Sequence, residues 1–249
     1  MAEEPTQIAL GNGRYHNRQI DDVLHPEREP KSALDELAKT MGSMEFSAQY
    51  QPAPVPRGGN LVKSAWLRYQ EEAPDPHDAD KIIVSWDTAQ SPGQSADYSA
   101  CVVLMVKGEK IYILEVMRAR LEYPDLKRAV LESNDRWREV GCDDFELVIE
   151  KSGAGLSLIQ DLHEEDIYPI GIKPDGDKNM RMSAQTAKFE AGAVHLPTQA
   201  PWLEEFKKEL LAFPLGRHDD QIDALSQALK RAHAPGPPSV ITGSYQVVG

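Results

Sequence analysis

The chain has 249 residues, of which 41% are hydrophobic, and its 40 acidic against 27 basic residues give a formal net charge of −13. This length suits one large domain, or one domain with an appendage. No apolar run approaches the roughly 20 residues of a membrane helix, and the N-terminus lacks a signal-peptide layout. Two cysteines are too few for a disulfide framework, so we expect a cytoplasmic protein. The acidic surplus argues against a surface that coats nucleic acid, because phosphate binding uses Lys and Arg.

The chain is expected to divide into three parts. Residues 1–80 read as an N-terminal arm or linker without a strong strand pattern up to about residue 56, but with a short helix over residues 32–40. Residues 81–232 carry the dense apolar pattern of a compact domain. Residues 233–249 begin with a run of Pro and Gly and are expected to form a mobile tail.

Within the compact domain, the pattern predicts five strands at residues 82–87, 99–106, 111–117, 147–150 and 168–172. Helices are predicted over residues 124–141, 156–162, 180–191, 202–213 and 219–232, with a short extended piece at 194–196. The fold class is therefore α/β: a mixed five-stranded sheet, with three antiparallel strands followed by parallel strands, and helices on both faces. If the fourth strand lies beside the first, Asp87 and Glu150 are neighbours at one edge of the sheet.

Acidic residues stand at the ends of two buried strands and at the start of the last helix. Asp87 ends the first strand, Glu150 ends the fourth, and Asp219, Asp220 and Asp223 open the final helix. Carboxylates at helical spacings of three and four lie on one face. Mg²⁺ and Mn²⁺ prefer carboxylate ligands, and two such ions can clamp the attacking and leaving oxygens of a phosphodiester. The pattern therefore predicts a site for two divalent metal ions, held by these five acids, that cuts nucleic acid.

Each acid taken alone also has a structural explanation. Asp87 could simply begin a turn, Glu150 could pair with Lys151, and the helix acids could cap the helix. Their occurrence together, on three elements that the topology brings to one place, favours the metal site. Basic residues of the following segment, Lys173, Lys178, Arg181 and Lys188, could position a phosphate backbone, although a solvated helix face explains them equally well.

Several of these stretches together resemble a known family. They are residues 86–89 (WDTA), 97–99 (DYS), 148–150 (VIE), 190–197 (EAGAVHLP) and 218–225 (HDDQIDAL), and residues 46–51 (FSAQYQ) are similar to the family's linker. The chain, from about Pro26 to Ala232, resembles the C-terminal nuclease domain of the large subunit of tailed-phage terminases. That domain belongs to the ribonuclease-H-like, or retroviral-integrase-like, superfamily.

The resemblance implies a metal-dependent DNA endonuclease that cuts concatemeric viral DNA during genome packaging. It implies Asp87, Glu150 and one acid of the last helix, with Asp220 ranked first, as catalytic residues. Lys178, Arg181 and Lys188 are expected to contact DNA. Double-stranded DNA, an ATPase motor, a small terminase subunit and a portal protein are the expected partners, and no membrane is.

One departure from the family limits what can be carried over. Family members place an ATPase motor before the nuclease, but this sequence has no G-x-x-x-x-G-K-[ST] phosphate loop. We therefore expect an excised fragment or a split-gene product, and no translocation activity. Two alternatives stay open: a resolvase or integrase-like nuclease of the same fold, and a non-catalytic module that docks a packaging motor. A sugar-kinase-like ATPase is disfavoured, because no glycine-rich loop follows the first strand.

Overall fold

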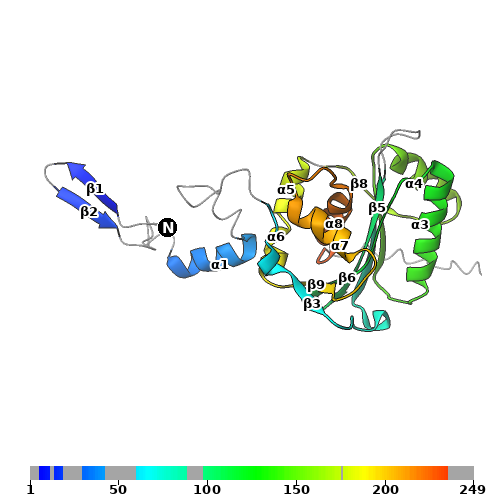
Figure 1. Ribbon diagram of the computed structural model, residues 1–249, viewed down its shortest axis with the longest axis horizontal. Coiled ribbons are helices and arrows are strands. Elements are labelled where there is room, and N and C mark those ends of the chain that lie inside the picture. Colours follow the sequence, from blue (N-terminus) through cyan, green and yellow to red (C-terminus); the bar gives the residue numbers. More distant parts are fainter. Residues whose placement is uncertain are drawn as a thin grey trace, which may run out of the picture.

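The computed structural model describes residues 6–11, 14–18, 30–42, 60–88, 98–174 and 176–234 (Figure 1). The motif residues Ala89 and Asp97, the linker-like residues 46–51 and the expected tail from residue 235 onwards lie outside these ranges. Before the main sheet come β1 (Thr6–Gly11) and β2 (Arg14–Arg18), a separate antiparallel pair, and α1 (Lys31–Met41). The α1 helix matches the one expected over residues 32–40, whereas no strand was expected in this part of the chain.

The main sheet has seven strands in the order β3-β9-β6-β5-β4-β7-β8. Their bounds are β3 Arg68–Gln70, β4 Lys81–Asp87, β5 Ser99–Lys107, β6 Lys110–Ala119, β7 Phe145–Glu150, β8 Ile170–Ile172 and β9 Val194–Pro197. As expected, β4, β5 and β6 are antiparallel, and β7 and β8 continue parallel to β4.

The expected count of five strands is wrong, because β9 and β3 extend the sheet beyond β6 in parallel. Both are short, with four and three residues, so their alternation is too brief to separate them from loops. Leu61, Val62 and Leu67, beside β3, pack into the core of the sheet. This segment lies upstream of residue 81, the expected start of the nuclease domain.

Helices cover both faces of the sheet (Figure 1). One face carries α3 (Tyr123–Arg138) and α4 (Ala154–Glu164). The other carries α5 (Lys178–Ser183), α6 (Thr186–Glu190), α7 (Leu203–Ala212) and α8 (Asp220–Arg231). The single helix expected over residues 180–191 is two helices, broken at Ala184 and Gln185. Two short 3₁₀ helices, Ser64–Trp66 and Pro76–Asp78, flank β3.

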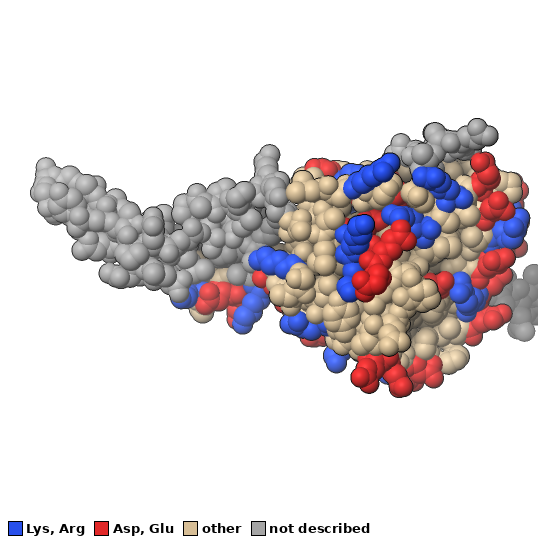
Figure 2. Space-filling view, viewed as in Figure 1, with Lys and Arg blue, Asp and Glu red and all other residues tan. Residues whose placement is uncertain are grey.

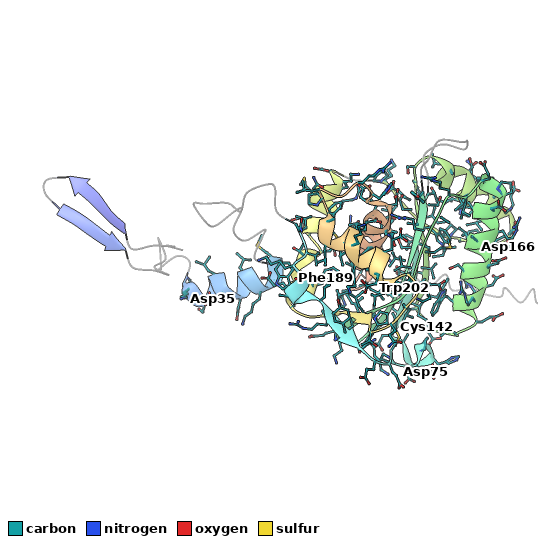
Figure 3. All side chains as sticks on the ribbon, viewed as in Figure 1. Asp35, Asp75, Cys142, Asp166, Phe189 and Trp202 are labelled. Carbon is teal, nitrogen blue, oxygen red and sulfur yellow. The ribbon has the colours of Figure 1, made fainter. Side chains whose placement is uncertain are left out.

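Two hydrophobic cores lie between the sheet and its helical layers, one on each face of the sheet. Trp86 belongs to the core under α3 and α4, whereas Ile83 belongs to the core under α7 and α8. Phe189 and Trp202, both labelled in Figure 3, lie on the α7 and α8 side. Because side chains alternate along a strand, the residues of β4 that share the face of Ile83 include its last residue, Asp87. The polar end of the strand therefore points toward α8.

Among the residues that the structure describes, no helix is long and apolar enough to cross a bilayer.

Candidate metal centre

The carboxyl ends of β4 and β7 place the first two acids side by side. Trp86 pairs with Ile149 in the parallel register, so Asp87 and Glu150 follow as neighbours at the same edge. On β7, Val148 packs in the α8-side core, and alternation puts Glu150 on that face as well. The expected adjacency of the two strands is therefore observed.

The α8 helix lies over this edge with its N-terminus beside the strand ends. Asp219 precedes the helix, and Asp220 and Asp223 lie in its first turn. The amide N–H of Gln221 donates to Glu209 Oε1 (2.8 Å) on α7, and the Gln221 side chain donates to Glu209 Oε2 (2.5 Å). Arg118 Nη1 on β6 donates to the same Oε2 (2.7 Å), so one buried carboxylate ties the start of α8 to the sheet. This support of the helix was not foreseen from the sequence.

All five predicted ligands line one cavity of about 570 Å³, which we call the acidic cavity. Asp177, Lys178, Arg181 and Tyr98 line it too. Figure 2 shows acidic and basic side chains interspersed on the face that carries α5, α7 and α8. The structure therefore brings together acids that are more than 130 positions apart in the chain, from Asp87 to Asp223.

The pKa values of the acids are raised by their burial and by their closeness to one another. The pKa of Asp87 is raised well above its usual range, first by burial and then by the charges of Glu150, Asp223 and Asp220, while Arg181 acts against them. Burial also raises the pKa of Asp220 and of Asp223, and Asp219 adds to both. Like charges held this close favour protonation or a bound cation.

Bases of α5 already pair with two of the acids. Lys178 Nζ donates to Asp219 Oδ2, and Arg181 Nη2 donates to Asp223 Oδ1 at 2.7 Å. Burial lowers the pKa of Lys178, but its hydrogen bond to Asp219 and the surrounding acids outweigh this and leave it raised. Two predicted DNA contacts are thus bonded to two predicted metal ligands.

Lys188 lies apart from this set. Its Nζ donates to Gln185 Oε1 (2.6 Å), and burial lowers the pKa of the ammonium group. It does not line the acidic cavity. Its DNA-binding role stays a prediction, without a contact to the cavity.

Of the five predicted ligands, three have no ion pair within the described residues: Asp87, Glu150 and Asp220. Glu150, only 7% exposed, is oriented by neutral donors, Ser152 Oγ at 2.8 Å and Gln227 Nε2 at 3.0 Å. A signal for Gln227 was present in the sequence, since it follows Asp220 and Asp223 at helical spacings of seven and four. Ser152, two residues after Glu150, could have been found in the same way.

Backbone packing fixes this edge closely. A Cβ on Gly155 would lie 2.1 Å from the carbonyl oxygen of Glu150 and 3.0 Å from Thr88 Oγ1, so only glycine fits there. The Thr88 hydroxyl is buried at the cavity and has no hydrogen-bond partner among the residues that the structure describes. An unpaired buried hydroxyl beside carboxylates suits a site that takes up water or a hydrated ion.

The donor set therefore fits a hard divalent cation, which prefers carboxylate oxygens. No three His, Cys, Asp or Glu side chains of the described residues are yet gathered around a point where an ion could sit. The pairs with Lys178 and Arg181 and the hydrogen bonds to Glu150 give a physical reason. Binding of an ion would therefore require at least a rotation of these side chains.

The family model described as the terminase RNaseH-like domain matches residues 84–232, which is more than half of the chain. The chain belongs to this family. The matched range contains β4, β7 and α8 and all five acids of the cavity. The expected family and the ribonuclease-H-like fold class are thereby confirmed. No curated protein sequence matches the chain significantly.

Solved structures share the fold of this terminase domain. The large terminase of a thermophilic bacteriophage superposes with a TM-score of 0.62 at 12% identity, over 80% of this chain and 52% of that protein. The chain thus spans about half the length of that relative. The large terminase nuclease of thermophilic phage G20c with bound magnesium has a TM-score of 0.52 at 16% identity, over 71% of this chain and 99% of that one. The same nuclease with bound cobalt has a TM-score of 0.53, with the same identity and coverage.

Proposed function

We propose that this terminase domain is a metal-dependent DNA endonuclease that cuts concatemeric viral DNA during packaging. The observation that carries the proposal is the acidic cavity, where acids from β4, β7 and α8 meet with more negative charge than the local bases neutralise. The nuclease of phage G20c binds magnesium on the same fold, which supports a divalent cation here. An ATPase motor, a small terminase subunit and a portal protein stay proposed partners.

We assign the principal ligand roles to Asp87, Glu150 and Asp220. These acids form no ion pair within the described residues, so their oxygens are available to a cation. Ser152 and Gln227 fix the direction of the Glu150 carboxylate, as residues behind a metal ligand commonly do. Two Mg²⁺ or Mn²⁺ ions bound here would neutralise charge on the attacking and leaving oxygens of a phosphodiester.

Asp219 and Asp223 are conditional ligands. Each joins the set only when Lys178 or Arg181 releases it. A released Lys178 or Arg181 would then be placed beside the cavity to hold a DNA phosphate, so one exchange would serve both binding events. In this proposal, α5 neutralises the site before the substrate arrives and positions the backbone afterwards.

Cleavage of supercoiled plasmid tests the function. We expect nicking with Mn²⁺ or Mg²⁺, none with EDTA, and at least about a 100-fold loss in Asp87→Asn, because even residues behind a ligand are worth 10- to 100-fold. Glu132→Gln, an exposed acid on α3 at the opposite face of the sheet, should cleave like wild type. Equal nicking by wild type and Asp87→Asn would refute the site. Strong preference for a four-way junction over linear duplex would instead favour the resolvase alternative.

A further inference from the structure

A second, smaller cavity of about 130 Å³ adjoins the acidic cavity, and we call it the basic cavity. It lies between the ends of β7 and β8 and the middle and end of α8. Glu150, Pro174 and Arg181 line both cavities, so the two are direct neighbours. A strand whose phosphate lies at the acids therefore has its adjacent phosphates close to the second cavity.

The charges of the two cavities are opposite. The acidic cavity is lined by six acids and two bases. The basic cavity is lined by Lys173, Arg181 and Lys230, with Glu150 as its one acid. The net charge of the lining residues therefore changes sign between two neighbouring cavities.

Two cations of the basic cavity have no ion pair, and the third has one free donor. Lys173 and Lys230 are exposed, and neither forms an ion pair within the part of the chain that the structure describes. Arg181 uses Nη2 for Asp223 and Nη1 for the Gly176 carbonyl, but its buried Nε–H has no acceptor among the same residues. A buried donor without a partner costs free energy, which an anion bound beside it would recover.

We infer that the basic cavity is a subsite for a backbone phosphate of the strand being cut, next to the scissile one. Lys173 and Lys230 bind this phosphate from β8 and α8, and Arg181 joins the two cavities. The inference rests on the proposed nuclease function. It adds Lys230 to the basic residues considered from the sequence, and it assigns Lys173 and Lys230 to one phosphate in a defined cavity. The positive charges of this subsite offset the repulsion between the DNA phosphates and the acids of the acidic cavity. They also hold the scissile phosphate over those acids.

Binding of a short DNA duplex, followed by fluorescence anisotropy in EDTA at several salt concentrations, tests the subsite. Each phosphate contact contributes about one to the slope of log affinity against log salt. We expect Lys173→Gln/Lys230→Gln to lower this slope by about 1 and to weaken binding of all sequences alike. Lys230→Arg should keep most of the wild-type slope. Lys110→Gln, whose exposed lysine starts β6 at the opposite end of the sheet from Asp87, is the matched control.

Two further measurements separate this inference from the proposed function. Calorimetric binding of Mn²⁺ and the thermal melting of the double variant should equal those of wild type, which excludes damage to the fold or to the acids. With Mn²⁺, its cleavage should show a raised KM. A wild type that binds DNA through these lysines but never cleaves would refute the nuclease and keep the subsite. A wild type that cleaves, with a double variant whose salt slope matches Lys110→Gln, would overturn the subsite alone.

Discussion

The two ends of α8 each bring charged groups into the interior, and they do so in opposite ways. At the C-terminal end, Glu146 on β7 has a fully buried side chain that accepts from Arg231 Nε (2.7 Å) and Nη2 (2.5 Å) and from Lys81 Nζ (3.1 Å). Lys81 also pairs with Asp144 (3.2 Å) and donates to the Ala234 carbonyl (2.8 Å). At the N-terminal end, Asp87 faces three further acids, opposed chiefly by Arg181.

The difference suggests a structural role for the charged groups at the C-terminal end of α8 and a ligand-binding role for those at its N-terminal end. The Glu146 cluster is balanced in charge, and Glu146 at its centre is fully buried between its two bases. The Asp87 cluster is unbalanced and open to a cavity, so it is costly in the absence of a bound proton or cation. The closed end fixes α8 against the sheet, and this lets the open end hold repelling acids in place.

Removing Glu146 should have the largest effect on stability. Glu146→Gln leaves the buried Lys81 and the partly buried Arg231 without their shared carboxylate, and breaking a buried ion pair from one side costs about 3–5 kcal/mol. We expect a loss of this size in the free energy of unfolding, measured by urea denaturation. Cleavage per folded molecule should be unchanged below the melting temperature. A stable Glu146→Gln protein with lost cleavage would show that this end of α8 also takes part in the chemistry.

The acids at the N-terminal end of α8 should make the protein less stable as pH rises, whereas an acid in an ordinary ion pair makes it more stable. Asp87, Asp220 and Asp223 have raised pKa values in the folded state. Below about pH 4, the unfolded value, they are protonated in both states and cost nothing. Above it the unfolded chain ionises first, so their contribution to stability falls as pH rises through the folded pKa values.

Comparison with Asp87→Asn isolates this effect from all other titrating groups. In EDTA, the variant should become more stable than wild type as pH rises from 4 to 8, by about 2–4 °C in melting temperature per kcal/mol. Added Mn²⁺ should reverse the order, because the ion binds deprotonated wild-type carboxylates and stabilises only the folded state. If the melting temperatures of the two proteins change with pH in parallel, burial and the neighbouring acids do not raise the pKa of Asp87.

The sequence was sufficient for the parts of the site that follow from strand polarity and helical spacing. Asp87 and Glu150 end apolar runs, and the parallel register puts such ends at one edge. Asp220 and Asp223 share a helix face. The alternation of β4 and β7 could also have shown that both acids face the same side as Glu146.

The sequence was insufficient where a pairing depends on distance through space. Nothing in the spacing of Lys178 and Asp219, which are 41 positions apart, indicates that they meet. The same holds for Arg118 and Glu209, 91 positions apart. The edge strand β3 was missed, and its neighbour β9 was predicted only as a short extended piece outside the sheet. Both are stabilised by neighbouring strands, and not by a pattern of their own.

Glu209 gives the smallest and most specific test, because it is a buried acid of the structural kind that contacts the end of α8 where the predicted metal ligands lie. It is buried like Glu146, yet it supports the open end of α8 by accepting from the Gln221 amide. Glu209→Ala removes the acceptor of the Gln221 amide, while Arg118 keeps Glu205 as an ion-pair partner, so we expect a cost of about 1–2 kcal/mol of stability, as for loss of a helix cap. Glu209→Gln should cost less, because its amide oxygen can still accept from that N–H.

The readout that a purely structural role would not move is metal affinity. If Glu209 positions the first turn of α8, then Glu209→Ala weakens Mn²⁺ binding by about 10-fold or more, as loss of a residue behind a ligand does. Glu146→Gln should leave the same affinity unchanged in spite of its larger loss of stability. Glu204 is an exposed acid on α7, the helix of Glu209, and it pairs only with Lys207 (2.9 Å) among the described residues. Glu204→Gln should change neither the stability nor the Mn²⁺ affinity. Equal Mn²⁺ affinity in Glu209→Ala and Glu204→Gln would mean that α8 holds its acids in place without this cap, by its apolar face and its C-terminal ion pairs alone.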